Sequence, residues 1–182
     1  MKIKSEDLIN DLIKRTQQTL KQTQQLKKLP LEILNKKSAP ESWSALECIE
    51  HLSLYGDFYL PEIEKKIQQS NSKPSPFFRS GILGNYFAKS MLPKEQLNKM
   101  KTFKDKNPLG SKLDLSTLDR FIAQQQKTIQ LLHQAKSVSL TKTKTTISIS
   151  KWIKLRLGDT FRVVIYHNQR HLAQATKAIN NG

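Results

Sequence analysis

The chain has 182 residues, 37% of them hydrophobic, which suits one ordinary globular domain over residues 1–182. Its single cysteine excludes an intramolecular disulfide and any metal site made only of thiolates within one chain. No run of about 18 apolar residues occurs, and residues 1–15 lack the apolar segment of a secretory signal. We therefore expect a cytoplasmic protein with no membrane partner.

The net charge of +16 could indicate a nucleic-acid-binding protein, since lysine and arginine neutralise phosphates. However, only six of the 31 basic residues are arginine, and the lysines are spread over the whole chain. We find no zinc-finger spacing, no Gly-rich phosphate loop and no basic motif interleaved with aromatic residues. We interpret the lysines as a solvated surface, so nucleic acid is not the expected partner.

Residues 5–28 lack glycine and proline and predict one long helix. Its inward seam would hold Leu12, Thr16, Thr19, Thr23 and Leu26.

A second helix should begin near Ser44, because Glu47 three positions later completes a capping-box pattern. It would run towards Ile67, with Pro61 either bending it or starting a new segment.

Residues 70–114 predict a long crossover, because they hold several prolines and glycines and one short helix-like run at 84–92. A third helix should begin near Ser116. Apolar and amide side chains recur along it every three or four positions, at Leu115, Leu118, Ile122, Gln125, Ile129 and Leu132.

After an irregular stretch at 137–150, the last helix is expected to carry a seam with spacings of four and three. Its members are Ile153, Leu157, Thr160, Val164, His167, His171 and Gln174. Four long helices with a crossover between the second and the third predict an all-α fold, a four-helix bundle.

The histidine pattern is the strongest chemical signal. His167 and His171 lie four residues apart and so share one helix face. His51, on the second helix, offers a third imidazole across the bundle. Three imidazoles leave a coordination position open for water or substrate, as in catalytic zinc sites. Asn168 follows His167, so the zinc-protease motif H-E-x-x-H is absent. The residues alone leave hydrogen-bonded core histidines as an equal alternative.

Three motifs resemble the DinB-like superfamily of metal-binding helical bundles: W-S-x-x-E-C-x-x-H-L at 43–52, L-D-R-F at 118–121, and the stretch from Leu157 to Ala175 around H-N-Q-R-H. The resemblance implies a four-helix bundle that forms a homodimer. It also implies a divalent metal ion, nickel or zinc, held by His51, His167 and His171.

Related members are S-transferases or isomerases that use a low-molecular-weight thiol such as mycothiol, bacillithiol or glutathione. The resemblance therefore implies a metal-dependent hydrolase or a thiol-dependent S-transferase, acting on an unknown small-molecule substrate. The alternative is a non-catalytic bundle with a structural metal or none, whose basic surface binds an anionic partner such as nucleic acid. Catalytic residues are not assigned.

Four other side chains have simpler interpretations. We expect Glu47 to cap its helix rather than to orient a ligand, and Cys48 to be a small buried residue. His133 should interact with the end of the third helix, and Arg170 should point away from the face shared by the paired histidines. None of the four is placed in the site.

Overall fold

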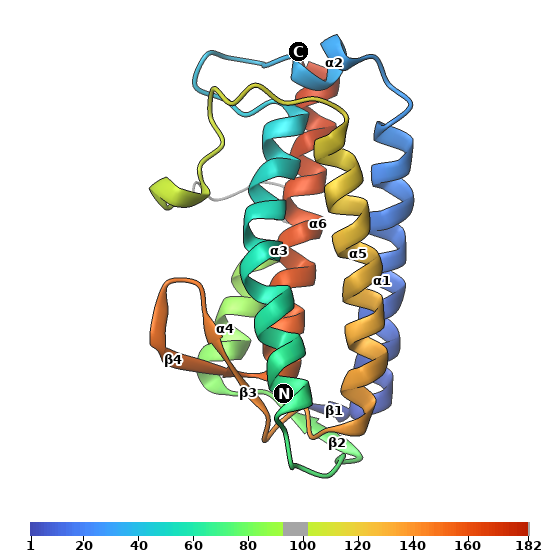
Figure 1. The fold of residues 1–182 in the computed structure, drawn as a ribbon, viewed down its shortest axis with the longest axis vertical. Helices are drawn as coiled ribbons and strands as arrows, with labels where there is room; N and C mark the ends of the chain where they lie inside the picture. Colours follow the sequence, from blue (N-terminus) through green and yellow to red (C-terminus); the bar gives the residue numbers. More distant parts are fainter. Residues whose placement is uncertain (93–101, 182) are drawn as a thin grey trace.

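The computed structural model describes residues 1–92 and 102–181 and is mostly helical, as predicted (Figure 1). Its long helices are α1 (Ser5–Leu26), α3 (Ala45–Gln68), α5 (Ser116–Gln134) and α6 (Leu157–Asn181). α3 packs against α5 and α6, and α1 packs against the same two helices. Figure 1 shows α1 and α6 running in one direction and α3 and α5 in the other. The core therefore lies along the length of these four helices.

Short elements connect the long helices. They are the helices α2 (Leu31–Asn35), α4 (Ile82–Met91), η1 (Lys104–Lys106) and η2 (Ala135–Ser137). Two antiparallel strand pairs accompany them, β1 (Lys2–Lys4) with β2 (Phe77–Arg79) and β3 (Lys144–Ile147) with β4 (Ser150–Arg156). The predicted crossover at 70–114 thus contains β2, α4 and η1, while its part at 93–101 lies outside the described residues.

The start of α3 is fixed by the predicted capping box. The Glu47 backbone N–H donates to Ser44 Oγ at 3.2 Å, and the Ser44 N–H donates to the Glu47 carboxylate at 2.8 Å. These two bonds satisfy helix N–H groups that would otherwise lack a partner. The helix then continues through Pro61 to Gln68, so Pro61 does not start a new segment.

The irregular stretch is confirmed at residues 138–143, but the prediction for residues 144–156 is wrong. Residues 144–156 form the β3–β4 hairpin, so Ile153 belongs to a strand and is 37% exposed, while α6 begins only at Leu157. Ile153, Leu155 and Leu157 recur every second residue, which fits a strand, whereas the four-residue step from Ile153 to Leu157 also fits a helix. Leu155 is buried and pairs with Thr145 of β3, so pairing with β3 decides the local structure.

The predicted seam of α1 is buried at all five positions. The seam of α5 is partly correct: Leu118, Gln125 and Leu132 are buried, but Ile122 and Ile129 are only half-buried. Leu115 is exposed and precedes the first residue of the helix. The inward face of α5 is displaced because other side chains with the same helical spacing point to the core. These are Phe121, Thr128 and Leu131.

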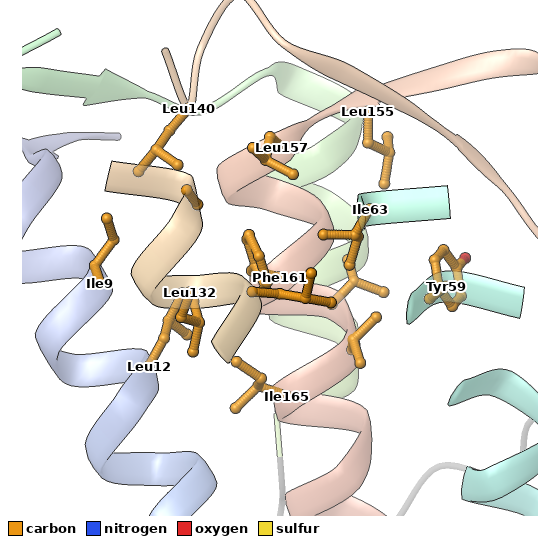
Figure 2. Packing of buried hydrophobic residues seen from close by; sticks show 14 of the residues in the cluster. Ile9, Leu12, Tyr59, Ile63, Leu132, Leu140, Leu155, Leu157, Phe161 and Ile165 are labelled. Carbon is orange, nitrogen blue, oxygen red and sulfur yellow. The ribbon is translucent and has the colours of Figure 1, made fainter. Parts of the chain in front are cut away.

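The larger apolar cluster joins all four long helices. Figure 2 shows Ile9, Leu12, Ile63, Leu132 and Phe161 among the side chains that meet there. A second cluster surrounds the N-terminal half of α3 and includes Cys48, Phe121 and Leu172. Burial of this apolar surface is the main force that holds the helices together.

A buried ion pair attaches α4 to α6. Arg162 Nη1 donates to Asp159 Oδ1 at 2.9 Å, and Arg162 Nη2 donates to Asn85 Oδ1 at 3.1 Å. Gly84 lies against this pair, and a Cβ atom at that position would overlap the Asp159 carboxylate. Glycine at 84 therefore allows α4 to approach α6, where α4 helps to enclose the cavity described below.

Candidate metal centre

The structure brings together the three histidines that the sequence singled out. His51 comes from α3, and His167 and His171 come from successive turns of α6, which packs against α3. One ring nitrogen of each histidine lies within 4.8 Å of those of the other two. His51 Nε2 and His167 Nε2 are 3.3 Å apart. The i, i+4 spacing on α6 and the position of His51 two turns after its N-cap create this cluster.

Hydrogen bonds fix which nitrogen of two rings faces the centre. His51 Nδ1 donates to the backbone carbonyl oxygen of Lys106 at 2.7 Å. His171 Nδ1 donates to Gln174 Oε1 at 2.9 Å, one turn further along α6. Because each Nδ1 carries the proton, Nε2 of both rings presents a lone pair to the cluster. Such outer partners commonly orient histidine ligands of metals.

Aromatic rings cover the cluster on two sides. The Trp43 ring lies 4.6 Å from the His51 ring and 5.7 Å from the His171 ring, measured between centroids. The Tyr55 ring lies 5.0 Å from that of His51 and 4.9 Å from that of His167. These rings remove water from the sides of the imidazoles and limit their rotation.

Burial keeps the three imidazoles neutral. It lowers the pKa of His51 to about 4 and that of His171 to about 3, and it holds the pKa of His167 well below its usual range. The neighbouring imidazoles lower the pKa of His167 further, because two adjacent rings cannot both take a positive charge at low cost. At neutral pH each imidazole is therefore uncharged and keeps one nitrogen lone pair, as a metal ligand must.

The geometry fits a divalent ion with nitrogen ligands. Two imidazole nitrogens on a tetrahedral zinc ion, each about 2.0 Å from the metal, lie about 3.3 Å apart. The His51 and His167 Nε2 atoms already have this separation. An all-imidazole donor set suits zinc, nickel or copper rather than magnesium or calcium, which prefer oxygen.

A cavity of about 930 Å³ reaches the cluster and is lined by all three histidines. His51 is buried, whereas His167 and His171 are half-buried because part of each ring faces this cavity. The cluster is therefore accessible to a small molecule from one side. A coordination position left open by three imidazoles would be reached from there.

Three residues that the sequence analysis kept out of the site are Glu47, Cys48 and His133. Glu47 is used by the capping box and by bonds from Lys37 and the Gly110 N–H. Cys48 is fully buried among apolar side chains, and burial raises the pKa of its thiol to about 12, so it stays protonated. His133 is exposed in the last turn of α5. The interpretation of these three residues is supported.

The expectation for Arg170 is wrong. Its side chain is buried and the residue lines the same cavity as His167 and His171. Arg170 lies between the two histidines in sequence, and the cavity wall is wide enough to include the flank of the helix as well as its centre. Burial lowers the pKa of Arg170, which still carries its charge at neutral pH.

Sequence reasoning missed the groups that orient the ligands. Gln174 was placed in the inward seam, and its i+3 spacing from His171 was the signal for a hydrogen bond. The Lys106 carbonyl gave no signal, because it lies 55 positions from His51, at the end of the short helix η1 in the crossover. The same crossover holds Trp43 over the cluster, since Trp43 Nε1 donates to Asn107 Oδ1 at 3.1 Å.

Comparison with known families agrees with this geometry. A model of the DinB superfamily matches residues 12–175, nearly the whole chain, so the protein belongs to the DinB superfamily. A three-histidine cluster in a mostly helical member of this superfamily fits a metal-binding protein.

Two further comparisons found nothing: neither the curated proteins nor the solved structures include a significant match to this chain. Within residues 1–92 and 102–181, the helices are too short or too polar to span a lipid bilayer.

Proposed function

We propose that this DinB protein is a metal-dependent enzyme, either a hydrolase or a thiol-dependent S-transferase, with zinc or nickel held by His51, His167 and His171. The observation that carries the proposal is the cavity whose wall includes all three imidazoles. A metal that only held α3 to α6 would need no such access. We also propose that the four long helices form one four-helix bundle, with the crossover between α3 and α5.

The residues of the site have distinct tasks. The three histidines supply neutral lone pairs, and Lys106 and Gln174 keep two of the rings in the required tautomer. Trp43 and Tyr55 exclude water from the sides of the rings. Lewis acidity is the chemistry that a divalent metal supplies in such a site, where it stabilises negative charge on an oxygen or sulfur atom.

The cavity has room for a substrate beside the histidines. Ligand pockets commonly measure about 300–1,000 Å³, and this one measures about 930 Å³. A hydrolase would bind its substrate and water there, whereas an S-transferase would bind a low-molecular-weight thiol beside the electrophile. The family membership favours the thiol, while the residues themselves are compatible with both reactions.

The test compares protein stripped by a chelator with protein reconstituted with zinc or nickel. Each form is assayed against a panel of esters, amides and thiol-transfer substrates, and circular dichroism follows its helicity. We expect the stripped protein to remain folded, because apolar burial holds the helices, and to lose its turnover. A stripped protein that unfolds, with no metal-dependent turnover in the panel, would instead support a purely structural metal.

A further inference from the structure

The cavity has two unlike ends because α3 and α6 run in opposite directions along it. On α6 its wall extends from Val163, through the histidines, to Lys177. On α3 the order is reversed, from Ser42 and Trp43 before the helix to Tyr59 within it. The fourteen residue-to-residue steps of helix from 163 to 177 span about 21 Å. The cluster therefore lies between one end of the cavity beside Val163, which we call the inner chamber, and the other end beside Lys177, which we call the outer mouth.

The inner chamber is apolar. Val163 and Val164 of α6 and Tyr59 of α3 form one part of its wall. Phe87 and Met91 of α4 and Ile147, Ile149 and Leu155 of the β3–β4 hairpin add further apolar surface. The Ser148 hydroxyl also lines the cavity and lies 3.4 Å from the Tyr59 hydroxyl, within hydrogen-bond distance. Tyr59 already has a partner for its hydroxyl, since the Ser148 N–H donates to it at 3.3 Å. The chamber thus offers contact area to a ligand but few unused hydrogen-bonding groups.

The outer mouth is more polar than the chamber, although Trp43 and the nearby Leu109 also line the cavity there. Glu41, Ser42 and Lys177 line it, together with Arg170 and Gln174 of α6. A ligand that occupied both ends would bury an apolar part beyond the histidines and keep a polar part in the mouth. Its reacting group would then lie between the two parts, beside His51 and His167.

We propose that the site takes an elongated amphipathic substrate, whose alkyl or aryl tail fills the inner chamber and whose polar end occupies the mouth. This inference rests on the proposed function for the position of the reacting group. The tail-binding chamber itself is made by apolar side chains and does not depend on a bound metal.

A series of ligands of increasing chain length measures how long a tail the chamber can hold. Straight-chain hydroxamates with two to ten carbons carry a metal-binding group at one end, and calorimetry gives their affinity for zinc-reconstituted protein. Each buried CH2 group contributes about 0.8 kcal/mol, so affinity should rise by up to about fourfold per carbon and level off when the chamber is full. Straight-chain alcohols tested on metal-free protein should show the same dependence on length, with weaker binding throughout.

Variants in the chamber should move the point at which affinity levels off. Val163→Phe fills part of the chamber and should shift it to shorter chains, and Val163→Ala should shift it to longer ones. Ile82→Phe is the matched control, because Ile82 is 95% exposed on α4 and a ring there leaves the chamber unchanged. Zinc content is measured for every variant and should stay at the wild-type value.

The outcomes separate this inference from the proposed function. The proposed chamber would be contradicted if affinity did not depend on chain length in either series. It would also be contradicted if affinity levelled off at the same chain length in both Val163 variants as in the wild type. Protein that binds no zinc would overturn the proposed function, while the alcohol series would still test the chamber.

Discussion

The buried polar groups of α1 and those on the α3–α6 face complete their hydrogen bonds in different ways. In α1, Thr16 Oγ1 donates to the Leu12 carbonyl at 2.8 Å and Thr23 Oγ1 to that of Thr19 at 2.9 Å. Each of these hydroxyls is satisfied one turn back in its own helix. On the α3–α6 face, His51 and His171 use Nδ1 for a fixed partner and direct Nε2 at the cluster.

The contrast shows how a structural polar group differs from a candidate functional one. A polar side chain that completes its bonds locally needs nothing from outside the protein. At the cluster, His51 Nε2 has no partner beyond the neighbouring imidazole of His167, and three imidazole nitrogens held this close together are a donor set that a divalent metal can bind. The histidines therefore form a group that could hold a metal ion, whereas the threonines do not. Four changes test this contrast, from the largest expected effect to the smallest.

The largest effect should come from a structural group. Asp159 accepts bonds from Arg162, Ser80 and the Gly81 N–H, and its side chain is fully buried. Asp159→Ala would leave the Arg162 charge buried without its carboxylate, which typically costs about 3–5 kcal/mol. Chemical denaturation should show this loss. A loss below about 1 kcal/mol would mean that the ion pair does not hold α4 against α6.

Gln174→Leu tests the orientation of a histidine. The change removes the acceptor for His171 Nδ1 and should weaken zinc binding about 10- to 100-fold, the usual effect of losing such a partner. Gln174→Glu keeps an acceptor and should retain most of the affinity. Competition with a chromogenic chelator measures both variants. Equal affinity in Gln174→Leu and wild type would exclude an orienting role for Gln174.

Thr16→Val tests a buried hydroxyl of α1 that completes its hydrogen bond within its own helix. The variant loses a hydroxyl that bonds only to its own helix, so the free energy of unfolding should change by about 1 kcal/mol or less. Zinc affinity should equal that of the wild type, because Thr16 lies outside the cluster. A large fall in zinc affinity would show that α1 contributes to the site.

The smallest expected effect is that of pH: zinc affinity should change little between pH 8 and pH 6. Protons compete with the metal only as the pH falls through the pKa of the ligands, and burial lowers those pKa values to about 4 for His51 and about 3 for His171. We therefore expect a change below about twofold in this window, and loss of the metal only in more acidic solution. Three histidines with an ordinary pKa near 6.5 would instead lose about 65-fold. A fall of that size would contradict the buried, neutral cluster.

The parts predicted from sequence share a physical basis. Helix α3 and its start could be predicted because Ser44 and Glu47 interact within one turn. His167 and His171 could be paired because helical spacing alone places them on one face. Such local rules also gave the threonine seam of α1.

The parts that could not be predicted depend on contacts between distant segments. The Lys106 carbonyl and the wall formed by α4 meet the site only because the crossover folds back over α3 and α6. The β3–β4 hairpin was missed because one apolar pattern fits both a strand and a helix, and pairing of Leu155 with β3 in the folded protein decides between them. Arg170 was misplaced for a related reason, since only the folded protein shows how far the cavity extends around α6.

The most direct test of the account is the zinc and nickel content of the protein, purified without a metal-affinity tag. Wild type is compared with single alanine variants of His51, His167 and His171, each after reconstitution. His133→Ala is the control, because this fourth histidine is exposed on α5 and outside the cluster. We predict about one metal ion per chain in wild type and in His133→Ala, and a large loss in the other three. Wild-type protein that binds no ion, or equal binding in all variants, would contradict a metal site at these histidines.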